Sequence, residues 1–198
     1  MSYAIMPYAV PLNELQAMIG SRDTALLDRL RSQWSSHLAS LDELREDTGL
    51  DGDDVPSAER ALEQMIMGEP YDDRIGFLYG YCLKILCGYA GWSLPNEGWW
   101  GMRFSWFETV AGELKNAGVD FDPTDLIFGG APISLPFIGD FPNIGHLKRA
   151  EMIPLLARFD GLNEDAVTDR EALEAILQIR DWLRQCVAAE RDLVCFYH

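Results

Sequence analysis

Residues 75–89 constrain the fold more than any other stretch, because apolar side chains cover most of the circumference of the helix predicted there. One face carries Ile75, Leu78, Tyr79, Cys82, Leu83 and Leu86, and another carries Phe77, Tyr81 and Ile85. A helix that is apolar on nearly every side belongs inside a protein. We therefore predict a central helix, with a notch at Gly76 and Gly80 where a neighbouring helix approaches closely.

Apolar residues recur at helical spacing along most of the remaining chain. The predicted helices cover 12–19 ending at Gly20, 23–41, 58–66 ending at Gly68, 105–117 ending at Gly118, 146–159 and 168–187. Capping boxes at Ser105-x-x-Glu108 and Thr168-x-x-Glu171 are expected to begin two of them. With a hydrophobic content of 48%, the chain can build a core. We predict a mainly α fold in a single compact helical domain over residues 1–198.

Two features interrupt the helical pattern. Residues 121–145 are rich in glycine and proline, which excludes long regular structure, yet their apolar side chains need burial. A long ordered loop packed on the helices is therefore expected. The β-prone ends, residues 3–10 and 193–198, predict one small strand pair formed by the termini.

The chain is strongly acidic, with 32 acidic and 16 basic residues and a net charge of −16. Nucleic-acid binding needs clustered lysine and arginine, and the densest basic pair is Lys148-Arg149, so no nucleic-acid partner is expected. The same charge repels anionic membranes and favours a basic protein as partner. A role of the charge in solubility alone remains the competing interpretation.

The cysteines, at positions 82, 87, 186 and 195, lack CxxC spacing, and no secretion signal or membrane span is predicted. A cytoplasmic protein is the expectation. Cys82 and Cys87 lie on the central apolar helix, where an inert buried thiol is favoured over a catalytic one.

Residues 42–54 hold seven acids and one arginine, which predicts an exposed linker. Read as a calcium loop from Asp47, this run fails, because Gly49 and Ala58 occupy positions that need oxygen ligands. No metal or cofactor motif is found elsewhere. Within the run, the candidate acidic interface comprises Asp47, Asp51, Asp53 and Asp54.

A tryptophan cluster and one histidine are the other candidate binding residues. Large aromatics and arginine are typical of interface anchors and ligand pockets, although aromatics also fill cores. His146 follows the glycine- and proline-rich loop, where function is common. The candidate binding residues are Trp92, Trp99, Trp100, Arg103, Trp106 and His146.

Several segments stand out by their glycine, proline and apolar positions. They are Tyr8-Ala-Val-Pro-Leu with Leu15 and Ile19-Gly20-Ser21-x-Asp23, Leu78-Tyr79-Gly80-Tyr81-Cys82-Leu83, Phe128-Gly129-Gly130-Ala131-Pro132 and Asp140-Phe141-Pro142-x-Ile144-Gly145. Together these segments resemble an uncharacterised family of bacterial hypothetical proteins. The resemblance implies a bacterial cytosolic protein and carries no activity or catalytic residue.

Two functions follow from these patterns. The first is a non-catalytic acidic interaction protein, an inhibitor or immunity-type partner of a basic protein, and we lean towards no enzyme activity because no catalytic constellation is found. The alternative is a small-molecule-binding protein or enzyme with a pocket between the Trp92–Arg103 loop and the Gly129–His146 loop.

Overall fold

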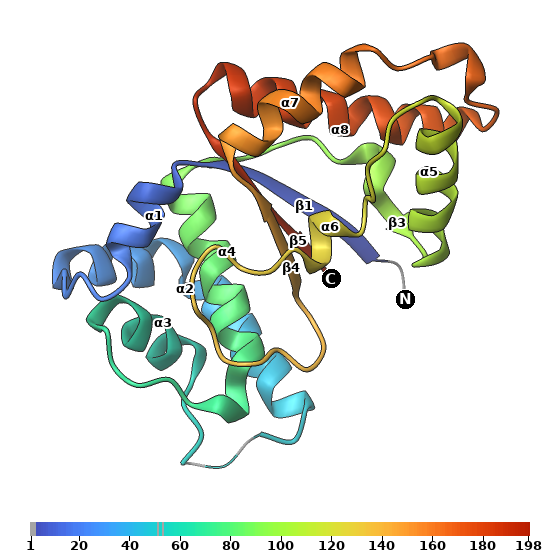
Figure 1. Cartoon of the computed structure of the whole chain (residues 1–198). Coiled ribbons are helices and arrows are strands. Elements are labelled where there is room, and N and C mark those ends of the chain that lie inside the picture. Colours follow the sequence, from blue (N-terminus) through green and yellow to red (C-terminus); the bar gives the residue numbers. More distant parts are fainter. Residues whose placement is uncertain (1–2, 51, 53) are drawn as a thin grey trace. The chain divides into compact units, whose positions relative to one another are not determined.

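The computed structural model of the chain describes residues 3–50, 52 and 54–198 (Figure 1). Helices account for 58% of the chain and strands for 12%, and the strands form a five-stranded antiparallel sheet. The mainly α prediction is therefore wrong. Helix dominates by content, but the presence of a real sheet makes the fold mixed α/β.

The chain divides into two compact units that interleave along the sequence. One unit, here called the sheet unit, comprises residues 1–11, 91–132 and 143–198. The other, the helical unit, comprises residues 12–90 and 133–142. The expectation of one domain over residues 1–198 stays a prediction.

The sheet unit is organised around the strands at the two ends of the chain. Strand β1 (Tyr3–Val10) runs antiparallel to β5 (Asp192–Tyr197), with register from Ile5 opposite Tyr197 to Val10 opposite Asp192. The predicted pairing of the termini is thus present, but as the centre of a sheet of order β2-β1-β5-β4. Strand β3 also pairs with β1.

The other strands are too short or too irregular in sequence to carry a strand pattern. Strand β2 covers Trp92–Ser93, and β3 covers Trp100–Met102. Strand β4 (Asn143–Leu147) lies where a loop and the start of a helix were expected, so the prediction of helix from residue 146 is wrong. Backbone pairing with β5 decides the conformation here, because local sequence preference does not report a distant partner strand.

Four helices complete the sheet unit. They are α5 (Ser105–Asn116), α6 (Asp125–Phe128), α7 (Arg149–Asp160) and α8 (Arg170–Ala188). Helix α8 packs on β1 and β5 and lies beside α7 (Figure 1), while α6 contacts β4 and β5. Ring contacts link the core from Trp99 to Trp182 and Phe107, and from Phe107 to Tyr197 of β5.

The two predicted capping boxes are wrong in their residues, although both helices exist. Helix α5 follows Phe104, which makes no side-chain cap, and Ser105 is its first residue. Helix α8 is capped by Asp169, whose carboxylate accepts hydrogen bonds from the amides of Glu171 and Ala172. Thr168 is engaged elsewhere, because it donates to the Glu113 carboxylate from its amide and its hydroxyl.

The helical unit surrounds the predicted central helix. It contains α1 (Leu12–Met18), α2 (Thr24–Asp47), α3 (Ala58–Met67) and α4 (Gly76–Ala90), with short 3-10 turn η1 (Asp73–Ile75). Helix α4 is buried along most of its length, as predicted. Helix α2 continues through Asp47, so the predicted linker begins later than residue 42.

The glycine notch on α4 receives an extended segment instead of a helix. A Cβ atom on Gly76 would lie 2.1 Å from the carbonyl oxygen of Phe137, and one on Gly80 would lie 2.9 Å from Ile138. Both contacts come from the 133–142 segment of the same unit. The glycines are therefore needed for packing, but the expectation of a helix in the notch is wrong.

Within the described residues, no helix combines the length and apolar character that crossing a membrane requires.

Candidate functional site

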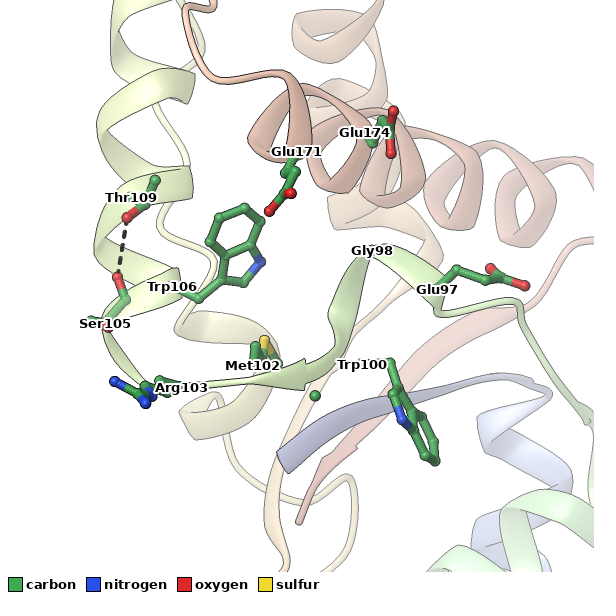
Figure 2. Close-up of a pocket in the computed structure, with 11 residues that line it drawn as sticks. Glu97, Gly98, Trp100, Met102, Arg103, Ser105, Trp106, Thr109, Glu171 and Glu174 are labelled. Carbon is green, nitrogen blue, oxygen red and sulfur yellow. Dashed lines mark hydrogen bonds between the residues drawn. The ribbon is translucent and has the colours of Figure 1, made fainter. Parts of the chain in front are cut away.

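An open cavity of about 460 Å³ lies in the sheet unit (Figure 2). It adjoins residues 92–103, here called the tryptophan-rich segment. Its walls are the 3-10 turn η2 (Glu97–Trp99), strand β3 and the first turns of α5 and α8. It is lined by Glu97, Gly98, Trp100, Gly101, Met102, Arg103, Ser105, Trp106, Thr109, Glu171 and Glu174.

Hydrogen bonds hold the tryptophan-rich segment against α8, and these contacts fix the position of one wall of the cavity. The Trp99 indole is fully buried and donates a hydrogen bond of 3.0 Å to the Ala175 carbonyl. The Gly98 amide donates to the Gln178 side chain at 2.9 Å. A Cβ on Gly98 would lie 3.0 Å from the Ala175 Cα, so glycine permits this close approach.

Two tryptophans that follow the buried Trp99 in the chain, Trp100 and Trp106, line the cavity. The Trp100 side chain is 66% exposed, an unusual cost for so large an apolar group. Trp106 is half-buried, and its indole nitrogen is buried without a hydrogen-bond partner among the described residues. An unpaired buried donor marks a position where a further acceptor would be stabilising.

The cavity carries three carboxylates and one guanidinium, so its lining is acidic. Glu97 accepts a hydrogen bond of 2.9 Å from Gln178, and Glu174 lies 3.4 Å from Arg170. Glu171 has no ion-pair partner in the part of the chain that the structure describes. Figure 2 shows the Glu171 side chain extending from α8 toward Trp106, whereas Arg103 and Glu174 extend away from that pair.

Aromatic faces beside carboxylates can bind an organic cation. The ring quadrupole attracts a positive charge, and the carboxylate supplies an ion pair and hydrogen-bond acceptors. Nucleophilic catalysis would need a thiol or hydroxyl next to a base such as histidine. Neither histidine nor cysteine occurs among the residues that line the cavity.

The structure brings three of the six predicted binding residues to this cavity, namely Trp100, Arg103 and Trp106. Trp92 is 43% exposed on β2, and Trp99 belongs to the core. His146 lies on β4, and its Nδ1 is 2.8 Å from the carbonyl oxygen of Gly130. The Gly129–His146 segment contributes no lining residue to this cavity.

The candidate acidic interface lies on the helical unit. Asp47 is exposed at the end of α2. Asp54 forms an ion pair of 2.7 Å with Arg74, and this guanidinium lowers the pKa of the Asp54 carboxyl. Asp51 and Asp53 lie outside the described residues.

The other candidates for chemistry are buried thiols. All four cysteines are free and buried. Burial raises the pKa of the Cys82 and Cys87 thiols well above its ordinary value, and it raises that of Cys186 to about 12. Thiolate nucleophiles are therefore disfavoured at these positions. Within the described residues, no group of three or more His, Cys, Asp or Glu side chains could hold a metal ion.

Sequence reasoning missed the carboxylates of the cavity. Glu171 was recognised only as part of a capping box, and Glu97 and Glu174 carried no pattern. They meet the tryptophan-rich segment because α8 packs against η2, a contact across more than 70 residues of chain. A charged residue on the exposed face of a helix gives no sequence signal of the segment that lies beside it.

Comparison with known proteins identifies the family. A family model described as a domain of unknown function (DUF7691) matches residues 1–198. The chain belongs to that family. No curated protein and no solved structure matches the chain.

Proposed function

We propose that this member of the DUF7691 family is a non-catalytic protein that binds a basic partner protein, as an inhibitor or immunity-type protein would. In this proposal, the cavity of the sheet unit receives a lysine or arginine side chain of the partner. The observation that carries it is that Trp100, Trp106 and Glu171 line one acidic cavity.

The charge of the chain supports the same assignment. A net charge of −16 attracts basic proteins from a distance and accelerates their encounter. Trp100, which lines the cavity, and Phe104, which follows the lining residue Arg103 in the chain, are 66% and 48% exposed. Aromatic anchors of this kind contribute much of the binding energy in protein interfaces.

A defined cationic probe tests the cavity itself. We would titrate the protein with N-acetyl-arginine amide by calorimetry, comparing the wild type with Glu171→Gln. An exposed ion pair contributes up to about 1 kcal/mol, so the variant should bind the probe about fivefold more weakly. Glu108→Gln, an exposed acid of α5 outside the cavity, removes the same charge and serves as control.

Affinity capture from native lysate at low and high salt then tests the partner. A basic protein that is retained by the wild type, released by salt and lost with Glu171→Gln and Trp100→Ala would support the proposal. Equal binding of the probe by the wild type and Glu171→Gln would exclude the cavity as the cation site.

The small-molecule alternative has one observation in its favour. The cavity volume of about 460 Å³ falls within the range of roughly 300–1,000 Å³ that is typical of ligand sites. Probe binding without any captured protein would favour a free organic cation as the ligand. The predicted pocket against the Gly129–His146 loop stays a prediction.

We also propose that the chain works in the bacterial cytoplasm. All four of its cysteines are free, which suits a compartment where thiols stay reduced.

A further inference from the structure

A second cavity, of about 450 Å³, lies within the helical unit and differs in character from the first. Its walls are the end of α2, the start of α4 and the 137–141 segment. The apolar side chains that line it are Leu44, Leu50, Phe77, Tyr81, Phe137 and Phe141. It shares no lining residue with the cavity of the sheet unit.

Two of these apolar groups are exposed at a cost that the fold of this unit does not explain. Phe137 is 87% exposed, the largest exposed fraction among the exposed apolar side chains, and Leu44 is 37% exposed. Covering an apolar surface of this kind is favourable in proportion to its area. The cavity is therefore suited to the apolar part of a ligand.

The wall of the cavity that carries Phe137 packs closely against helix α4. The Phe137 backbone packs against Gly76, where even a methyl group has no room. The side chains of Ile138 and Pro142 pack against Gly80, so the segment also contacts α4 beyond Phe137. A cavity with a fixed wall needs little ordering when a ligand binds, which favours affinity.

The charges at the cavity are unbalanced. Its one cation, Arg74, is already engaged by carboxylate oxygens of Asp72 and Asp54, each at 2.7 Å. Asp73 and Asp140 also line the cavity, and the structure gives neither an ion-pair partner among the described residues. The Asp140 carboxylate lies close enough to Tyr81 to add to the effect of burial, which raises the pKa of that phenol to about 12. Carboxylates therefore outnumber cations at the cavity, and its electrostatic potential is negative.

We propose that this cavity binds a small amphiphilic organic cation, with its apolar body against Phe77 and Phe137 and its ammonium group beside Asp140. This site is independent of the proposed binding of a basic partner by the sheet unit. The ligand class follows from an apolar lining combined with unpaired carboxylates and an occupied arginine.

Three probes with the same apolar body test the proposal on the full-length protein. We would measure the binding of 4-phenylbutylamine, 4-phenylbutanol and 4-phenylbutyrate by calorimetry at physiological salt. The amine should bind about fivefold more tightly than the alcohol, because an exposed charge pair contributes up to about 1 kcal/mol. The carboxylate should bind most weakly.

Two variants locate the site. Asp140→Asn should remove the preference for the amine while leaving binding of the alcohol unchanged, and Phe137→Ala should weaken all three probes. Both side chains are exposed, so the variants should fold. Glu14→Gln removes an exposed acid of the same unit outside the cavity and controls for overall charge.

The proposal for the sheet unit and the proposal for the helical unit can be refuted independently, because each variant is expected to affect one cavity only. Glu171→Gln should leave binding of the amine unchanged, and Asp140→Asn should leave binding of N-acetyl-arginine amide unchanged. Equal affinities for the three probes, a preference for the carboxylate, or binding that survives both Phe137→Ala and Asp140→Asn would overturn the proposal.

Discussion

The contact between Glu113 and Thr168 shows how one buried carboxylate links helix α5 to the segment that precedes α8. Glu113 lies on α5 and is only 9% exposed. Its two oxygens accept hydrogen bonds from the Thr168 amide at 3.0 Å and hydroxyl at 2.6 Å. These bonds lower the pKa of the Glu113 carboxyl, because they favour its charged form.

This pKa shift predicts a contribution to acid stability. A carboxyl whose folded pKa is lowered stabilises the fold above its unfolded pKa, about 4.5, and loses that contribution as the pH falls through the folded pKa. Glu113→Gln should therefore be less stable than the wild type at pH 7, with the difference shrinking below pH 4.5. Urea unfolding across this range measures it. Glu108→Gln is the control, and parallel curves for Glu113→Gln and the wild type would contradict the prediction.

The cysteines predict a second result at the scale of single residues. All four are buried and free, and burial raises the pKa of Cys82, Cys87 and Cys186. Native protein should therefore react with a thiol reagent such as dithionitrobenzoate far more slowly than the unfolded chain, which should release four equivalents. Fast reaction of one native thiol would identify a reactive site and contradict this expectation.

At the scale of elements, we expect the packing of the 133–142 segment against α4 to be especially sensitive to substitution. A Cβ on Gly76 would lie 2.1 Å from a backbone oxygen of Phe137, and backbone cannot move aside as a flexible side chain can. Gly76→Ala should destabilise the protein by about 1–3 kcal/mol, the usual cost of overpacking.

A matched glycine provides the control for this substitution. Gly112 lies inside α5, and a Cβ there would meet no atom within 4 Å beyond its chain neighbours and the backbone of its own helix. Gly112→Ala should stabilise the protein by up to about 1 kcal/mol, because alanine favours the helix more than glycine does. Urea unfolding measures both variants. Equal effects of the two substitutions would contradict the packing inferred at Gly76.

Helices were predictable as elements because their periodicity is local. The helices of residues 12–19, 58–66 and 75–89 are present with ends close to those predicted. Asp23 begins α2 as expected, with its carboxylate accepting from the Leu26 amide. The strands β2, β3 and β4 were not predicted, because their conformation depends on pairing with β1 or β5 far away in sequence.

At the scale of the whole molecule, β1 links the beginning of the chain to residues near its end. It pairs with β2, β3 and β5, so the sheet depends on one strand from the first eleven residues. A fragment of residues 91–198 lacks this strand. The fragment should therefore show no cooperative unfolding transition, whereas the full-length chain, which contains β1, should show one.

The unfolding of the fragment can be followed by the near-ultraviolet circular dichroism of its tryptophans. The full-length chain provides the reference spectrum. A cooperative transition in the 91–198 fragment alone would show that β5 and β4 form a stable sheet without β1.

The sequence alone determined most of the helical segments, the β-prone termini, the burial of Cys82 and Cys87 and the acidic charge, because each is a property of local pattern or composition. It also selected Trp100, Arg103 and Trp106 by residue type. The tertiary structure alone decided that a five-stranded sheet forms and that Glu171 lines the same cavity as these residues. Both depend on contacts between segments far apart in the chain, and a local pattern carries no information about such partners.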